Sequence, residues 1–130
     1  MTPPRLTRED MAILRLESGE VAGHTLKVLV LDPPPGGPRP GLEEIRATVA
    51  SRLDAAPELR RCLAPTPLRL AAPVWVDDED FDIARHVRPV PSAGPVTAPR
   101  LRRIIAEAMR ERLDRTHPLW SLDVVERHSA

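Results

Sequence analysis

The sequence predicts an α/β domain, because segments with helical periodicity alternate with short segments rich in β-branched residues and leucine. The chain has 130 residues, which is the length of one domain, and no internal repeat is visible. A domain of this length buries roughly two-thirds of the surface that its unfolded chain exposes. The chain is therefore long enough to form a hydrophobic core.

The N-terminal third predicts a helix, a strand and a loop. Thr7 can cap a helix whose apolar residues recur up to Gly19. Residues 24–31 are rich in Val and Leu, which predicts a strand. Eight of the ten residues at 32–41 are Pro or Gly. Pro fixes the backbone and lacks an N–H donor, and Gly makes the backbone flexible. The composition therefore predicts an exposed loop.

The middle of the chain predicts one helix and two short strands. Leu42, Ile45, Val49 and Leu53 are spaced three and four residues apart, as in an amphipathic helix with one buried stripe. Residues 74–76 and 86–90 are strand candidates. Five acids lie within residues 77–82, but their spacing is not that of a calcium loop. We interpret this run as a solvated turn anchored by an inward-facing Phe81.

The C-terminal third predicts a second loop, a helix and a final strand. Residues 91–99 form the proline-rich loop. A stripe of apolar residues surrounded by arginines then predicts a helix, and residues 116–118 end it. The stripe consists of Leu101, Ile104, Ile105, Ala108 and Met109. Alternation from Trp120 to Val124 predicts the final strand.

Charge and composition exclude several classes of function. Nineteen basic and nineteen acidic side chains give a net charge of zero, so no basic surface for nucleic acid is expected. The apolar run at residues 28–31 is far shorter than the roughly 20 residues that span a bilayer. The N-terminus lacks the apolar stretch of a secretory signal. We expect a cytoplasmic protein without a transmembrane segment, and peripheral contact with the inner face of the membrane stays open.

No catalytic or metal-binding motif is visible. The four histidines, His24, His86, His117 and His128, are scattered, and Cys62 is the single thiol. No zinc site with the usual ligand spacing is therefore expected. Two arginines precede Cys62 and could lower its pKa, but we interpret it as a half-buried structural residue. The prediction is no metal, no cofactor and no catalytic residue.

The order of the segments is more informative than any single motif. The most specific stretches are P-V-W-V-D-D-E-D-F-D-I-A-R-H-V at residues 73–87 and L-D-R-T-H-P-L-W at residues 113–120. With the helix that carries Asp10-Met11-Ala12 and the strand that His24 leads, they resemble the N-terminal region of the bacterial bifunctional wax ester synthase/acyl-CoA:diacylglycerol acyltransferase family. The resemblance covers residues 6 to 126.

The resemblance implies both a fold and an activity. Family members look like two-lobed enzymes of the chloramphenicol acetyltransferase type, so residues 1–130 would be an incomplete N-terminal lobe, a mixed sheet flanked by about three helices. Such enzymes transfer a fatty acyl group from coenzyme A to diacylglycerol or a long-chain alcohol. The second histidine of an H-H-x-x-x-D-G motif is their general base, a task that suits an imidazole near neutral pH. The implied substrates are acyl-CoA and a lipid alcohol.

The sequence departs from the family at this motif. It contains no H-H pair and no D-G pair. In the family the motif follows the strand after the P-L-W strand, and this chain ends before it. His128 is followed by two residues and cannot replace the motif. We therefore expect a fragment that is inactive alone, and whether it is an enzyme stays open.

Four residues carry over from the family, each with two interpretations. Pro118, Leu119 and Trp120 match the P-L-W motif, which lies near the catalytic channel in such proteins; alternatively they pack the sheet. His24 matches a histidine near the start of the first long strand. Its alternative role is a structural hydrogen bond.

Two other functions stay open. The chain could be a non-catalytic remnant or interaction module that pairs with a separate partner chain, or with itself, through an unpaired strand edge near residues 120–125. Contact with a lipid droplet is a further alternative. A condensation domain of peptide synthesis would lack the same motif, but the pattern at residues 75–87 favours the lipid enzyme.

Overall fold

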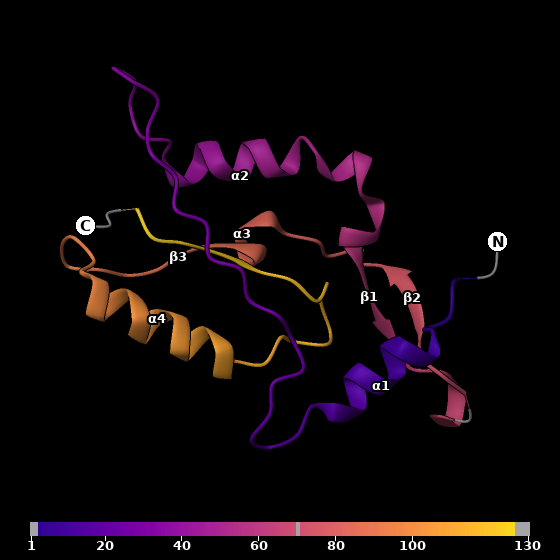
Figure 1. Cartoon of the computed structure of the whole chain (residues 1–130). Coiled ribbons are helices and arrows are strands. Elements are labelled where there is room, and N and C mark those ends of the chain that lie inside the picture. The colour runs from indigo at the N-terminus through magenta and orange to yellow at the C-terminus, as the bar shows by residue number, and fades with distance from the viewer. Residues whose placement is uncertain (1–2, 70, 127–130) are drawn as a thin grey trace.

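The chain folds as an α/β structure, as the sequence predicts. The computed structural model describes residues 3–69 and 71–126 (Figure 1); His128 lies outside them. The helices are α1 (Arg8–Leu16), α2 (Leu42–Ala50), α3 (Ile83–His86) and α4 (Ala98–Arg110). The strands are β1 (Arg61–Ala64), β2 (Val74–Asp77), β3 (Val87–Pro89) and β4 (Leu122–Val124). Short 3-10 turns lie at Leu53–Ala55, Pro57–Arg60 and Pro67–Arg69.

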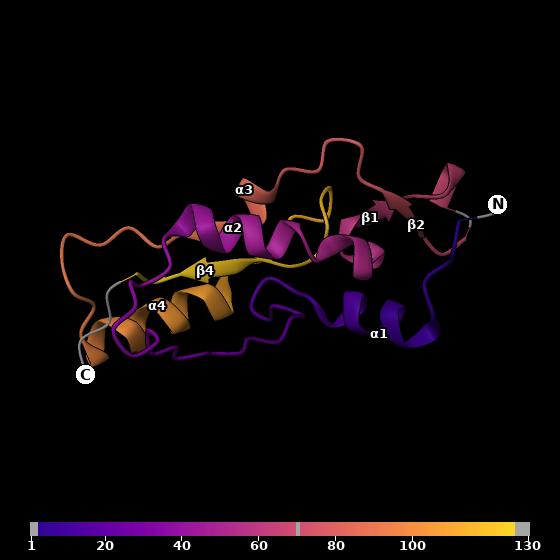
Figure 2. The same cartoon turned by 90° about the horizontal axis from the view of Figure 1, so that it is seen from above.

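The strands form two small sheets within the described residues, instead of the single mixed sheet that was expected. β1 and β2 are antiparallel, with Cys62 opposite Val76. The N-terminal segment extends this pair, because the Trp75 N–H donates to the Pro4 carbonyl over 2.9 Å. β3 and β4 are parallel, with Val87 opposite Leu122. Two views at right angles place this parallel pair between α2 and α4 (Figures 1 and 2).

The buried core is small. Among the described residues, the apolar side chains with little exposure are Leu6, Leu53, Val87 and Val96. His86 is also buried, with 3% of its surface exposed. Val87 and His86 lie at the junction of α3 and β3, so the core centres where β3 meets α2 and α3.

The predicted helices are confirmed, with shifts at their ends. Thr7 caps α1 in a capping box: its hydroxyl accepts from the Asp10 N–H, and the Asp10 carboxylate accepts from the Thr7 N–H. α4 begins at Ala98, so the second predicted loop ends two residues early, and Pro99 occupies the first turn, where a missing N–H costs little. α4 ends at Arg110, well before residues 116–118, because Glu111 is extended and its carboxylate binds Arg88.

The strand predicted at residues 24–31 is wrong. This segment is neither helix nor strand in the described chain, and it runs an open course along the outer side of α4 (purple in Figure 2). Composition favours extended backbone there, but a strand also needs a hydrogen-bonded neighbour, and no described residue supplies one. The loop at residues 32–41 is confirmed as free of helix and strand.

The structure adds two elements that the sequence does not predict. β1 has no alternating pattern and is recognisable only through its pairing with β2. α3 is a single turn, capped by Asp82, whose carboxylate accepts from the Ala84 N–H over 2.9 Å. In the described part of the chain, no helix is both long and apolar enough to cross a membrane.

Candidate functional site

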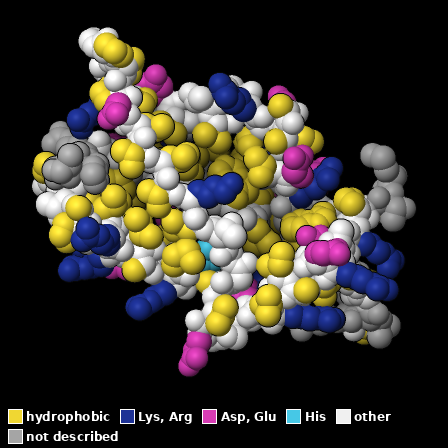
Figure 3. Space-filling model, viewed as in Figure 1, with side chains coloured by type: hydrophobic (Ala, Val, Ile, Leu, Met, Phe, Trp, Pro, Cys, Tyr) yellow, Lys and Arg dark blue, Asp and Glu magenta, His cyan; other side chains and the backbone are white. Residues whose placement is uncertain are grey.

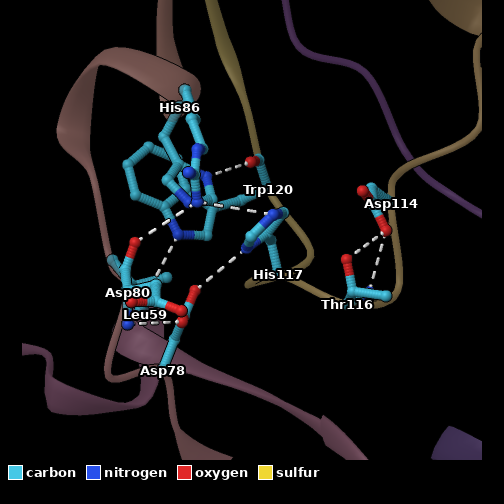
Figure 4. A network of polar contacts seen from close by, with 9 residues as sticks. Leu59, Asp78, Asp80, His86, Asp114, Thr116, His117 and Trp120 are labelled. Atoms are coloured by element: carbon cyan, nitrogen blue, oxygen red, sulfur yellow. Dashed lines mark hydrogen bonds and ion pairs between the residues drawn. The ribbon is translucent and has the colours of Figure 1, made fainter.

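The candidate site lies where the turn after β2 packs against residues 114–120 (Figure 4). The turn is built by Asp78: its backbone N–H donates to the Arg60 carbonyl over 2.8 Å, and its carboxylate accepts from the Asp80 N–H over 3.0 Å. These bonds fix the acidic run against the start of β1. They also aim Phe81 at α3, which is one wall of the site.

Three rings form a continuous stack at the centre of the site. The His86 ring lies between Phe81, with centroids 5.0 Å apart, and Trp120, with centroids 4.5 Å apart. His86 Nδ1 donates to the Trp120 carbonyl over 2.8 Å, and Trp120 Nε1 donates to the Leu59 carbonyl over 2.7 Å. Stacking and hydrogen bonding together hold α3, the 3-10 turn at Pro57–Arg60 and the residues just before β4 in one arrangement.

The tautomer of His86 follows from its partner. A carbonyl only accepts, so Nδ1 carries the proton and, in the neutral ring, Nε2 is left with a free lone pair. Nε2 is buried and has no hydrogen-bond partner among the described residues. A buried nitrogen without a hydrogen-bond partner lowers the stability of the folded state. His86 Nε2 is such a nitrogen.

A second histidine lies at the rim of the stack and is oriented by a carboxylate. His117 Nδ1 is 3.2 Å from an Asp78 carboxylate oxygen, and the Asp78 side chain is only 8% exposed. The Arg85 guanidinium lies 3.5 Å from His117 Nε2. In the neutral ring Nδ1 donates to Asp78 and Nε2 accepts from Arg85. The arrangement can hold one tautomer of His117 and exchange a proton. The Arg85 guanidinium, however, lies against Nε2, the nitrogen that a general base would use.

The turn before His117 is held by hydrogen bonds within itself and to α1. The Asp114 carboxylate accepts from the Thr116 N–H over 2.9 Å and from the Thr116 hydroxyl over 2.7 Å. These hydrogen bonds lower the pKa of the Asp114 carboxyl. Arg115 donates to the Leu14 carbonyl over 2.9 Å and forms an ion pair with Glu17. Residues 114–117 are thus anchored to α1 as well as to themselves.

The parallel sheet next to the site is held by a shared guanidinium. Arg88 on β3 binds the Asp123 carboxylate on β4 with two nitrogens, over 2.8 and 3.2 Å. A third nitrogen reaches Glu111 over 3.1 Å. The hydrogen bond to Asp123 raises the pKa of Arg88 further, so the residue stays charged. This network links β3, β4 and the end of α4.

The structure brings three of the four expected site residues together. Pro118 is buried, and Leu119 and Trp120 are partly buried beside the stack. His24 lies elsewhere: its Nε2 donates to the Ala108 carbonyl of α4 over 3.1 Å, and its Nδ1 is buried without a partner in the described chain. His24 therefore makes a structural hydrogen bond, and among the described residues none of the hydrogen bonds joins it to Trp120.

Sequence reasoning missed His86, His117 and Asp78. The two histidines are 31 positions apart and come to the same site because β3 and β4 pair in parallel, a long-range event that leaves no local pattern. Asp78 also corrects an expectation, because its carboxylate is largely buried instead of solvated. The available signals were the acid run before Phe81 and the histidine directly before Pro118.

Cys62 behaves as a partly buried structural residue. It lies on β1, and burial is the first cause that raises the pKa of its thiol, followed by the charge of Asp78. The neighbouring arginines do not lower this pKa, which contradicts the alternative of an activated thiol. Among the described residues, no three His, Cys, Asp or Glu side chains come together as a metal site.

Comparisons with known proteins point to one family. The wax ester synthase/diacylglycerol acyltransferase catalytic domain matches residues 6–127. Rv3087 of Mycobacterium tuberculosis, named provisionally as a diacylglycerol O-acyltransferase, is 37% identical over 94% of this chain and 26% of its own length. tgs3 of the same species, also provisionally named a diacylglycerol O-acyltransferase, is 36% identical over 94% of this chain and 44% of its own length.

A solved structure shares the fold. The wax ester synthase/diacylglycerol acyltransferase from Marinobacter aquaeolei VT8 superposes with a TM-score of 0.70 at 21% identity. The match covers 100% of this chain and 30% of that one. The chain thus spans about a quarter to less than half of the length of these relatives.

Proposed function

Because the chain belongs to the wax ester synthase/diacylglycerol acyltransferase family, we propose that it is the N-terminal part of an acyl-CoA-dependent O-acyltransferase. The enzyme would move a fatty acyl group from coenzyme A to diacylglycerol or a long-chain alcohol and so make triacylglycerol or a wax ester. The observation that carries the proposal is the family match from residue 6 to residue 127, across nearly all of the chain.

The chain would supply structure and a channel wall, and the rest of the enzyme would supply the chemistry. Acyl transfer to a hydroxyl needs a base that takes the alcohol proton as the oxygen attacks the thioester. The H-H-x-x-x-D-G motif that performs this in the family does not occur in this sequence. His117 does not replace it, because Arg85 lies against its Nε2. We therefore propose that this chain alone is inactive.

For Pro118, Leu119 and Trp120 we propose a place beside the acyl channel, as the resemblance implies. The contacts of Trp120 support a positioning role, since its ring stacks on His86 and its N–H binds the Leu59 carbonyl. Leu119 is the aliphatic residue of the three and is partly buried, so it is the one that we would substitute. Leu119→Ala in the completed enzyme should raise KM for palmitoyl-CoA with little change in unfolding, and an equal loss of stability would favour a packing role.

We also propose a cytoplasmic location with peripheral contact to the inner face of the membrane. The reaction joins two substrates that partition into lipid, so the enzyme would have to work at a lipid surface, and none of the described helices of this chain crosses a membrane. Cell fractionation tests this: the protein should sediment with membranes and be released by a wash that leaves integral proteins in place. Recovery only in the soluble fraction would contradict it.

The function is tested by completing the chain. We would co-express it with the part of Rv3087 that it does not match, then supply palmitoyl-CoA with diacylglycerol or hexadecanol and measure released thiol. Turnover by the combined chains and none above background from either chain alone is the expected result. A matched control replaces this chain by its His86→Ala variant, which should lower the yield of active enzyme.

A second candidate is a non-catalytic interaction module. It is favoured by the open edges of the two-stranded sheet of β3 and β4 in the described part of the chain, near Trp120–Val124. Such a module would self-associate or bind a separate chain without acyl transfer. Size-exclusion chromatography distinguishes the two states, because a clean monomer at high concentration would count against a self-associating edge.

A further inference from the structure

Among the helices of the chain, α4 concentrates positive charge. It holds four arginines and one glutamate, which give it a net charge of +3, although the net charge of the whole chain is zero. α1 holds two arginines and two acids, and α2 holds one arginine and two acids. Positive charge is therefore concentrated on one helix of a chain that is neutral as a whole.

The arginines of α4 lie on the side of the helix that faces solvent. Four of the five residues of its apolar stripe are partly buried, and Met109 is 41% exposed, whereas all four arginines are exposed. Helical periodicity places Arg103 and Arg110 on one line, and Arg100 and Arg102 on either side of that line. Figure 3 shows Arg and Lys side chains along the edge of the molecule where Figure 1 places α4. We call these four side chains the arginine face.

The arginine face has no acidic partner within the described part of the chain. Its four side chains make no ion pair and no hydrogen bond with another described residue, and Glu107, the single acid of the helix, pairs with none of them. Arg88 and Arg115 differ, since each binds a carboxylate. Arg100 and Arg103 are neighbours on the helix surface, and their like charges repel each other. A negatively charged partner would relieve this repulsion, so the arginine face is complementary to an anionic surface.

A cavity of about 300 Å³ lies at the C-terminal end of the arginine face. Its lining includes Arg110 and Arg112, the exposed apolar side chains of Val21 and Met109, and Glu20. Two arginines against one glutamate leave the cavity positive. It thus combines cationic and apolar groups, as a lipid-binding surface does.

We infer that the arginine face of α4 is the surface by which this chain docks onto a membrane that contains anionic phospholipid. The inference rests on the proposed function and specifies how its peripheral contact with the membrane is made. Charge complementarity gives the attraction, because guanidinium groups bind phosphate oxygens strongly. The exposed Met109 and Val21 favour a lipid over a nucleic acid, since apolar side chains enter the boundary between headgroups and acyl chains.

Sedimentation with lipid vesicles tests the docking surface. The 130-residue chain is mixed with vesicles of phosphatidylcholine alone, or of phosphatidylcholine with about one-third phosphatidylglycerol. It should bind the anionic vesicles at least tenfold more tightly than the neutral ones. Salt at about 1 M should release it, because the Debye length then falls to about 3 Å.

Paired substitutions on two helices locate the docking surface. Arg103→Gln with Arg110→Gln should weaken binding to the anionic vesicles at least tenfold, since each arginine near such a surface contributes roughly fivefold in affinity. Arg8→Gln with Arg15→Gln is the matched control, because these exposed arginines are also seven residues apart on a helix, α1. The control should change binding by less than about twofold. Urea denaturation of both variants checks that each stays folded.

Four results would overturn the inference. These are no binding to anionic vesicles, equal binding to neutral ones, unchanged binding by the α4 variant, and an equal loss in the α1 control. Tighter binding of duplex DNA, lost in the same α4 variant, would identify a nucleic acid as the occupant instead.

The acyl-transfer assay on the combined chains, run in detergent without vesicles, separates this inference from the proposed function. Turnover together with vesicle binding that the α4 variant leaves unchanged refutes the docking surface only. Vesicle binding that this variant loses, without turnover by the combined chains, refutes the function only.

Discussion

His86 is the residue on which the candidate site depends most. It is 3% exposed, lies between two aromatic rings and donates to the Trp120 carbonyl. His86→Ala removes the central ring and leaves a cavity and an unpaired carbonyl. We expect the free energy of unfolding to fall by about 2 kcal/mol, measured by urea denaturation. The exposed Arg112→Ala is the control and should change it by less than about 0.5 kcal/mol. Equal effects would refute the central role of His86.

The reactivity of the Cys62 thiol should depend on pH differently in the folded and the unfolded chain. Burial, and next the charge of Asp78, raise the pKa of its thiol. The thiolate is the reactive form, so at pH 8 the folded chain should react with iodoacetamide more slowly than the urea-unfolded chain, and its rate profile should lie at higher pH. The charge of Asp77 adds a third, smaller cause, so Asp78→Asn removes one of three and should shift the profile part of the way back toward the unfolded one. Identical folded and unfolded profiles would contradict the prediction.

None of the residues of α1 is buried, and among the described residues side-chain hydrogen bonds fix its two ends. Thr7 caps its start, and Arg115 binds the Leu14 carbonyl near its end. Thr7→Ala should cost about 1 kcal/mol and speed amide exchange in the first turn roughly fivefold. Arg115→Met should speed exchange in the last turn and leave the first turn unchanged. Uniform changes along α1 in both variants would show that the ends are not independent.

Local signals in the sequence predicted the elements that local interactions make. The Thr7 cap and the apolar spacing of α2 and α4 lie within one or two helical turns, so the sequence alone could identify these helices. The strand predicted at residues 24–31 was wrong because a strand depends on a hydrogen-bonded neighbour, which can lie far away in the chain. The site was partly predictable: P-L-W marked its position, but the stack with His86 and the Asp78–His117 pair require β3 and β4 to meet.

At the scale of the whole molecule, the large exposed surface of the folded chain predicts weak dependence of stability on denaturant. Its accessible area is 9998 Å², whereas a folded monomer of 14.4 kDa exposes about 6,800 Å². The m-value is proportional to the area that unfolding exposes. An unfolded chain of this mass exposes about 21,000 Å², so unfolding from 9998 Å² exposes about a quarter less new surface than a complete domain would. The urea m-value of the isolated chain should be lower by about that fraction. An m-value of the isolated chain equal to that of a complete domain of the same mass would mean that no further partner is needed to complete the fold.

Acyl transfer by the completed enzyme is the most direct test of the central claim, that this chain is one structural part of an O-acyltransferase whose chemistry lies elsewhere. The measurement is thiol release from palmitoyl-CoA in the presence of diacylglycerol or hexadecanol. We expect background rates for the 130-residue chain alone and clear turnover once the unmatched part of Rv3087 is added. Turnover by this chain alone, or none from the combined chains, would contradict it.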